Sequence, residues 1–228
     1  MARSVSTKEP ALLKEAGSSV RKRKAIFEAA MKVFLKSGYL GASMDEIAAL
    51  AKVSKQTIYK QFSNKESLFV EIVTSMTDTA SKTVHTGVPE LPSNGEVAEY
   101  LQLYAFRQLT VVLTPPLMQL RRLVIGEVSR FPKLALILYE RGPQRAIAAF
   151  ARVLEHFAAL GFLTIADPMT AASHFNWLVM SEPLNKAMLL GDEAIPKPAA
   201  LRRHTAECVR VFLAAYENRS AAAQRCSR

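Results

Sequence analysis

Residues 43–69 read SMDEIAALAKVSKQTIYKQFSNKESLF, and this stretch contains two short helical patterns in succession. Ser43 followed by Glu46 forms a capping box, which predicts a helix over residues 44–51. A second pattern of seven residues spans 55–61. An isolated helix of that length is unstable in water, because nucleation is costly and few hydrogen bonds follow it. Neighbouring helices must therefore hold the second helix in place.

The second helix is mostly polar, and this composition suggests a binding surface. Ile58 and Phe62 can point inward against Ile47 and the preceding helix. The outward side chains are then Lys55, Gln56, Thr57, Tyr59 and Lys60. A short rigid helix with such a face fits the major groove of DNA, with the preceding helix crossing the backbone, as in a helix-turn-helix. A solvated helical hairpin without a DNA role would give the same pattern.

The charge distribution favours the DNA interpretation. The 228 residues carry a net charge of +10, and residues 1–70 hold 13 Lys and Arg against 6 Asp and Glu, a net of +7. Residues 71–228 hold 17 against 14, a net of +3. A basic N-terminal third indicates a polyanionic partner. Lys65 stands where the next helix begins, so that a cation and a helix N-terminus can meet the same phosphate.

Helical periodicity and turn residues divide the chain into four segments. We expect a flexible basic arm at 1–18, a helix-turn-helix domain at 19–66, a helical domain at 67–218 and a flexible tail at 219–228. Gly38 is placed to end the first helix, and Ser63 with Glu66 forms a second capping box. Helical patterns separated by Pro and Gly continue to the C-terminal region, without sustained β alternation. The predicted fold is all-α, with about nine helices.

The second domain is rich in aromatic residues and methionine, and two uses of them remain open. They can fill a plain helical core, or they can enclose an apolar pocket with a few polar groups that orient a ligand. The candidate pocket residues are Tyr104, Arg107, Met118, Arg122, Phe150, Leu154, Phe175, Asn176, Trp177 and Met180.

The last two long helices carry apolar stripes that suggest a homodimer interface. The candidate interface residues are Ala171, Phe175, Leu178, Val179, Val209 and Phe212. Stripes of this kind could equally pack within one subunit. Dimerisation is favoured on functional grounds, because one short recognition helix makes too few base contacts to specify a genomic site.

Other classes of protein receive no support from the sequence. Cys208 and Cys226 form neither a disulfide framework nor a metal motif, and the four histidines are scattered without metal-ligand spacing. No phosphate loop or nucleophile–base set is present, so we expect no metal, no cofactor and no enzyme. No apolar run reaches the ~18 residues of a membrane helix, and the first residues lack a signal-peptide core. We therefore expect a cytoplasmic protein that does not bind a membrane.

Residues 21–70 as a whole resemble the N-terminal domain of the TetR/AcrR family of transcriptional regulators. The residues that carry the resemblance are Ile47, Ala48, Val53, Ser54, Thr57, Ile58, Tyr59, Phe62, Lys65, Leu68 and Phe69. The second half is similar to the ligand-binding and dimerisation domain of some AcrR-like members. The resemblance implies a homodimer on a double-stranded DNA operator and a small-molecule effector that releases it.

The resemblance also implies roles for individual residues. Ser43 caps the second helix near the phosphate backbone, where Ser replaces the commoner Thr of the family. Tyr59 and Lys65 match positions that contact phosphate. The recognition-helix positions that approach DNA are matched by Ser54, Lys55, Gln56, Thr57 and Lys60.

We therefore expect a DNA-binding transcriptional regulator, a repressor released by an apolar or aromatic effector. The alternatives are a DNA-binding protein without an effector and an interaction protein whose helix-turn-helix contacts another protein. The salt dependence of binding distinguishes the interaction protein from the two DNA-binding proteins, because phosphate contacts make affinity for DNA fall steeply with salt.

Overall fold

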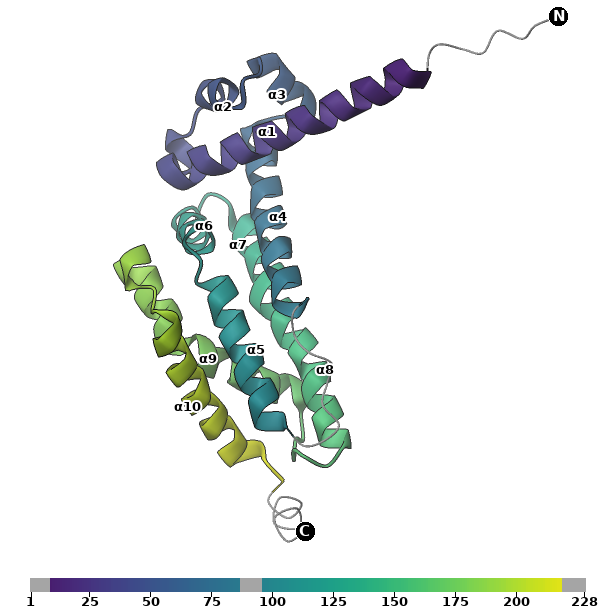
Figure 1. The fold of residues 1–228 in the computed structure, drawn as a ribbon. Coiled ribbons are helices and arrows are strands. Elements are labelled where there is room, and N and C mark those ends of the chain that lie inside the picture. The colour runs from purple at the N-terminus through teal and green to yellow at the C-terminus, as the bar shows by residue number, and fades with distance from the viewer. Residues whose placement is uncertain (1–8, 87–95, 219–228) are drawn as a thin grey trace, which may run out of the picture. The chain divides into compact units, whose positions relative to one another are not determined.

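The computed structural model describes residues 9–86 and 96–218, which form ten α-helices (Figure 1). The helices α7 and α8 are joined without a break by a π-helical turn, so the expected count of about nine agrees. Within the described ranges the extended structure is limited to one antiparallel bridge between Leu163 and Glu217. The all-α prediction is confirmed.

The chain divides into two compact units that meet between Val73 and Thr74, inside one helix. The first unit contains three complete helices and the start of a fourth. They are α1 (Glu9–Gly41), α2 (Met44–Ala51), α3 (Lys55–Gln61) and α4 (Lys65–His85). The flexible arm was expected to extend to residue 18, but α1 already begins at Glu9, in a segment of good helix formers. Residues 1–8 lie outside the described part of the chain.

The first unit has a compact apolar core that explains where the units meet. Phe34 of α1 packs against Phe69 of α4, with ring centroids 5.0 Å apart. Ile47 of α2 and Ile58 of α3 are also fully buried. Burial continues along α4 as far as Val73, and this moves the boundary beyond the expected position at residue 66.

Two residues with positive φ shape this unit. Gly38 interrupts α1 with φ 70°, a conformation that Gly adopts without a Cβ penalty, so the sequence signal for a helix end there corresponds to a kink. Lys52 closes α2 with φ 55°, and its N–H bonds the carbonyl of Ala48. A left-handed residue at this position turns the chain from α2 into α3.

The second unit is a helical bundle. The rest of α4 joins six further helices, a π-helical turn at Glu140–Gln144 and a short 3₁₀ turn at Asp192–Ala194. The six helices are α5 (Val97–Val112), α6 (Pro115–Gly126), α7 (Pro132–Tyr139), α8 (Arg145–Ala159), α9 (Pro168–Leu190) and α10 (Pro198–Tyr216). Residues 219–228, expected to form a tail, lie outside the described part.

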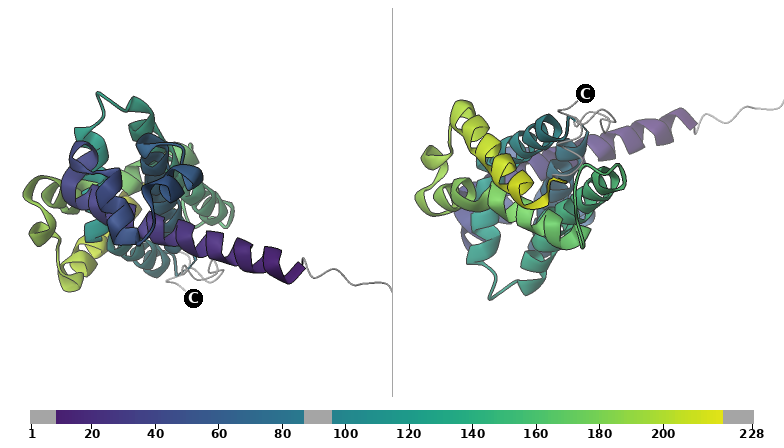
Figure 2. Two further views of the ribbon diagram at one scale, coloured as in Figure 1. Left: turned by 90° about the horizontal axis from the view of Figure 1, so that it is seen from above. Right: turned by 90° about the horizontal axis from the view of Figure 1, so that it is seen from below.

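The stripes proposed as a dimer interface lie in the core of a single chain. α9 packs against α8 and α10, and α10 also packs against α5 (Figure 2). Phe175 stacks on Phe150 at 4.5 Å and meets Phe212 edge-on at 5.1 Å. Five of the six residues are buried and Leu178 packs beside them; the five are Ala171, Phe175, Val179, Val209 and Phe212. These residues therefore pack within one subunit, the alternative that the stripes left open, since apolar periodicity shows that a face is buried but not by what.

Candidate nucleic-acid interface and ligand cavity

The helix α3 is short but capped at both ends. Ser54 accepts a hydrogen bond from the Thr57 N–H at 3.1 Å, and the two hydroxyl oxygens lie 2.8 Å apart. At the other end the Phe62 N–H bonds the Ile58 carbonyl at 2.8 Å. Ile58 is fully buried, which fixes the rotation of the helix about its axis. These contacts supply the stability that seven residues lack alone.

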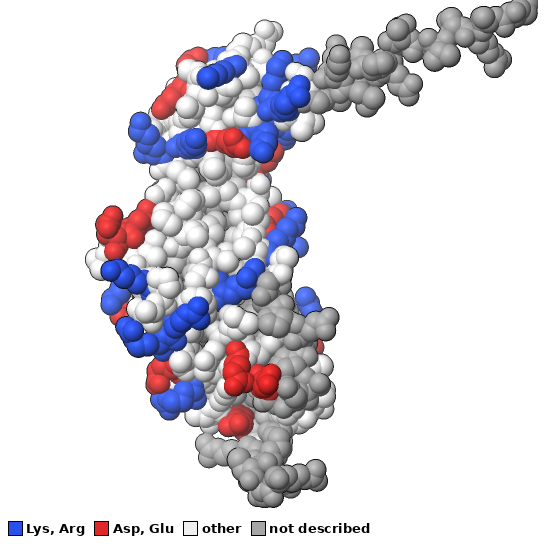
Figure 3. Space-filling model, viewed as in Figure 1, with Lys and Arg blue, Asp and Glu red and all other residues white. Residues whose placement is uncertain are grey.

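The outer face of α3 carries the residues expected to approach DNA. Lys55, Gln56 and Lys60 are exposed, and Tyr59 is 44% exposed although its ring is large. Thr57 is half-buried because its hydroxyl lies against Ser54. The helix contains no acidic residue, and Figure 3 shows Lys and Arg side chains on the visible face of this unit with acidic ones among them. The face offers amide, hydroxyl and ammonium groups, the chemistry that DNA bases and phosphates require.

Lys55 has an acidic partner in the free protein. Its ammonium donates to the Asp45 carboxylate at 2.9 Å, and this hydrogen bond raises the pKa of Lys55. Asp45 stands in the first turn of α2, beside the capping hydroxyl of Ser43, which accepts from the Glu46 N–H at 3.0 Å. Both side chains of the ion pair are exposed, so water and salt screen the attraction. Lys55 can therefore exchange Asp45 for a DNA acceptor at small cost.

Lys65 opens α4 and lies over an aromatic ring. Its Nζ stands 4.7 Å from the centroid of Tyr39, and it donates to the Leu40 carbonyl at 3.4 Å. The adjacent cap differs from the expected one, because Asn64 accepts from the Ser67 N–H at 2.7 Å and Ser67 accepts from the Asn64 N–H at 3.1 Å. A reciprocal Asn–Ser pair thus takes the place of the predicted Ser63–Glu66 box.

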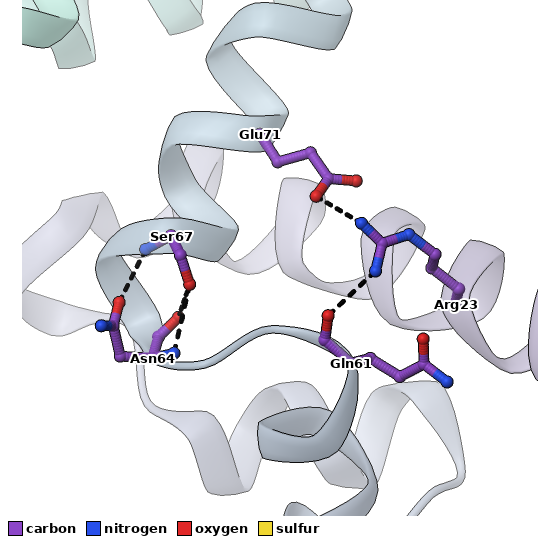
Figure 4. A network of polar contacts seen from close by, with 5 residues as sticks. All are labelled: Arg23, Gln61, Asn64, Ser67 and Glu71. Carbon is purple, nitrogen blue, oxygen red and sulfur yellow. Dashed lines mark hydrogen bonds and ion pairs between the residues drawn. The ribbon is translucent and has the colours of Figure 1, made fainter.

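Arg23 ties α1 to both helices that follow the turn, a role missed from the sequence. Its guanidinium donates to the Gln61 carbonyl at 2.9 Å and to the Glu71 carboxylate at 2.5 Å (Figure 4). It also lies 4.3 Å from the Phe62 ring centroid. The run of four cations at 21–24 gave no sign of which one would turn inward. Arg23 fixes the C-terminal end of α3 and so positions its outer face.

The second unit contains a cavity of about 750 Å³, including the open solvent at its mouth. Because this volume counts the open solvent at the mouth, it is an upper bound on the space that a ligand can fill. Helices α4, α5, α6, α7, α8 and α9 and the π-helical turn all contribute to its wall. The apolar lining includes Val84, Val112, Leu117, Leu120, Leu138 and Leu184.

A few polar groups face this apolar space. Gln108 donates to the Asn176 side-chain oxygen at 2.9 Å, and the two residues are 3% and 4% exposed. Gln108 Oε1 and Asn176 Nδ2 make no hydrogen bond with any residue that the structure describes. Arg121 also lines the cavity, and burial lowers its pKa. Buried polar groups without partners are rare in folded proteins and are common where a ligand binds.

The predicted pocket residues are only partly those that line the cavity. Asn176, Trp177 and Met180 belong to its wall. Five others fill the core beside it, where aromatic stacking and helix packing leave them no free face: Tyr104, Met118, Phe150, Leu154 and Phe175. Gln108 and Arg121 were not expected in the pocket. Each is a polar residue within an apolar stripe of its helix, and that signal was available from the sequence.

The two arginines expected in the pocket have structural partners instead. Arg107 donates to the carbonyls of Thr83 and Val84, the last turn of α4. Arg122 donates to the Ala187 carbonyl at 2.7 Å and pairs with Asp192. Both guanidiniums thus bond helix C-terminal carbonyls, which otherwise lack partners.

The wall of the cavity that belongs to α4 is held by ion pairs. Asp78 accepts from Arg141 at 2.8 Å and from Arg145 at 3.3 Å. Arg141 lies within the π-helical turn, and the neighbouring Gly142 and Pro143 line the cavity. A single carboxylate therefore joins α4 to the turn and to α8.

Comparison with known proteins places both units. Residues 26–72 match the sequence profile described as bacterial regulatory proteins, tetR family, and residues 99–218 match the AefR-like transcriptional repressor, C-terminal domain. The chain is also 30% identical over 187 residues to the uncharacterized HTH-type transcriptional regulator YhgD of Bacillus subtilis, covering 76% of this chain and 93% of that protein.

The chain belongs to the TetR family of bacterial transcriptional regulators. A solved TetR-family structure from Mesorhizobium loti MAFF303099 is 36% identical, with a TM-score of 0.80 over 87% of this chain and 98% of that one. The flavonoid-responsive regulator FrrA is 30% identical, with a TM-score of 0.71 over 87% of this chain and 98% of that one.

Membership of the TetR family makes the protein a DNA-binding transcriptional regulator and not an enzyme. In the TetR family such proteins act as dimers on DNA operators and respond to small molecules. No helix among the described residues is long and apolar enough to cross a membrane. The same residues contain no cluster of His, Cys, Asp or Glu suited to a metal ion.

Proposed function

We propose that this TetR-family protein is a repressor that leaves its operator when a small molecule with an apolar or aromatic body occupies the cavity of the second unit. The observation that carries the proposal is that α4 belongs partly to the helix-turn-helix unit and partly to the cavity wall of the second unit. Thr77, Ala80, Ser81 and Val84 of this helix line the cavity, while its first nine residues belong to the helix-turn-helix unit. A ligand in the cavity therefore contacts a helix of the DNA-binding unit.

The chemistry of the cavity and of one relative supports an aromatic effector. Four leucines, two valines, Met180 and Trp177 contribute to the wall, and such surfaces bind flat apolar rings well. FrrA is named as responsive to flavonoids, which are aromatic compounds.

Release requires a difference in affinity between two forms of the repressor. A ligand with equal affinity for the DNA-bound and the free form shifts nothing, however tightly it binds. Because the coupling is reciprocal, operator DNA must weaken ligand binding by the same factor as the ligand weakens DNA binding. Typical couplings of this kind are about 5- to 150-fold.

The experiment measures ligand affinity with and without an operator fragment, at two salt concentrations. Ala80→Trp is designed to fill the cavity, and it should retain DNA binding while abolishing release. The matched control is Ala159→Trp, at an exposed position at the end of α8. Equal affinities with and without DNA for every ligand that binds would leave a DNA-binding protein without an effector.

We further propose that the homodimer forms through the outer faces of α9 and α10. The apolar stripes of these helices are used within the chain, so the interface must involve their exposed side. Val211 lies on that side of α10 and is 41% exposed. Val211→Glu should give monomers in light scattering, whereas Arg152→Glu, exposed on α8, should not. A monomeric unaltered protein would refute this proposal.

A further inference from the structure

Arg121 lies on the wall of an apolar cavity, and no acidic side chain among the described residues pairs with it. It is half-buried on α6 and makes no hydrogen bond or ion pair with any other described residue. None of the residues that line the cavity is acidic. Its neighbour Arg122, by contrast, is satisfied by Asp192 and the Ala187 carbonyl. A partly desolvated charge is costly unless an opposite charge accompanies it.

The Gln108–Asn176 pair adds one unused donor and one unused acceptor to the same wall. The free groups are Asn176 Nδ2 and Gln108 Oε1, both on buried side chains. Exchanging O and N in both amides restores the mutual hydrogen bond and again leaves one donor and one acceptor. The pair therefore has one unused donor and one unused acceptor whichever way the amide O and N atoms are assigned.

We infer that the effector is an aromatic carboxylic acid bound as its anion, with its carboxylate on Arg121 and a polar substituent on the Gln108–Asn176 pair. The inference rests on the proposed function, because it names the ligand class of that cavity. The apolar wall accommodates the ring system, and the guanidinium fork matches a carboxylate with two parallel hydrogen bonds.

The charge of the ligand, rather than its shape, should decide affinity. A carboxylate and its primary amide have nearly the same size, but only the carboxylate carries the charge that Arg121 lacks. Hydrogen bonds to charged groups contribute more than neutral ones, so the acid should bind on the order of 10- to 100-fold more tightly than its amide. A cavity built for a neutral ligand would show no such preference.

The first test uses the unaltered full-length protein and three probe pairs in calorimetry. Benzoate, 2-naphthoate and 4-biphenylcarboxylate are each compared with the corresponding primary amide. At least one acid should bind and should exceed its amide by about tenfold or more. If the amides bind as well as the acids and release DNA, the ligand class is wrong while the proposed function stands. If none of the three acids binds, the ligand class is overturned, whereas the proposed function is decided separately by the comparison of ligand affinity with and without operator DNA.

The second test locates the charge that is recognised. Arg121→Met keeps an apolar side chain of similar length and should reduce the acid-to-amide preference to about one. Arg121→Lys should retain part of it, since the charge stays but the fork is lost. Arg152→Met removes an exposed arginine of α8 outside the cavity and should leave the preference unchanged. A full preference in Arg121→Met would overturn the inference.

Discussion

Arg23 provides a sharp test of how the helix-turn-helix unit positions α3. Replacing Arg23 with Met removes three contacts together: the Gln61 carbonyl, the Glu71 carboxylate and the Phe62 ring. The side chains of Arg23 and Glu71 are 42% and 39% exposed, so the ion pair itself contributes at most about 1 kcal/mol. A cation at a helix C-terminus adds about 0.3–1 kcal/mol, and a cation over an exposed ring adds about 0.5–1 kcal/mol.

Allowing for overlap between these contributions, Arg23→Met should make opening of α3 easier by about 1–2.5 kcal/mol. Amide hydrogen exchange of residues 55–62, read by mass spectrometry on the full-length protein, should then accelerate roughly 5- to 60-fold. DNA affinity is a poorer measure of this effect, because losing any cation from this basic unit weakens DNA binding.

The neighbouring residue supplies a matched control. Lys24→Met removes the same charge one position along, but among the described residues the ammonium of Lys24 pairs only with the exposed Glu28, at 3.9 Å. Its effect on exchange in α3 should correspond to no more than about 0.5 kcal/mol. Arg23→Lys should lie between the two, since one donor cannot reach both acceptors. Equal exchange rates in Arg23→Met and Lys24→Met would refute the positioning role.

Three further predictions follow from the same geometry. Tyr59→Phe should weaken binding to all DNA sequences alike, whereas Gln56→Ala should change base preference by about 1–3 kcal/mol at one position, as measured across an operator library. Lys52→Gly should raise the unfolding free energy by up to about 1 kcal/mol in urea titration, because Lys52 has φ 55°. Burial raises the pKa of the Cys208 thiol to about 11, so in a Cys226→Ser background it should resist thiol reagents at pH 8 until the protein unfolds.

The helix-turn-helix was predictable because its signals are local. Ser43 and Ser54 cap the helices that begin one residue later, and α2 and α3 have the bounds expected from the sequence. Each signal depends on residues within one turn of the chain, where side-chain chemistry and backbone geometry determine each other. The Ser63 box was wrong because Asn64 stands one residue nearer and caps equally well.

The arrangement of the second unit was less predictable, because it depends on which faces meet. The periodicity of α9 and α10 marked buried residues, and within the subunit α9 packs against α8 while α10 packs against α5. The helix also continues through Glu140–Gln144 although Pro143 cannot donate a regular helical hydrogen bond. A π-helical turn accommodates the proline and directs Gly142 and Pro143 to the cavity.

The restraints on α4 indicate how the proposed ligand would act. In the first unit α4 is bound to Arg23 through Glu71, and in the second unit it is bound to Arg141 and Arg145 through Asp78. Two residues after Glu71 lies Val73, the last residue of the first unit, and one residue before Asp78 lies Thr77 in the cavity wall. A ligand that separates the π-helical turn from Thr77 has one of two effects. It either breaks or lengthens the ion pairs of Asp78, or it moves α4 together with the turn. Because those pairs are partly exposed and individually weak, ligand contacts of a few kcal/mol are sufficient to change them. The Glu71–Arg23 contact then makes the position of α3 sensitive to the same helix.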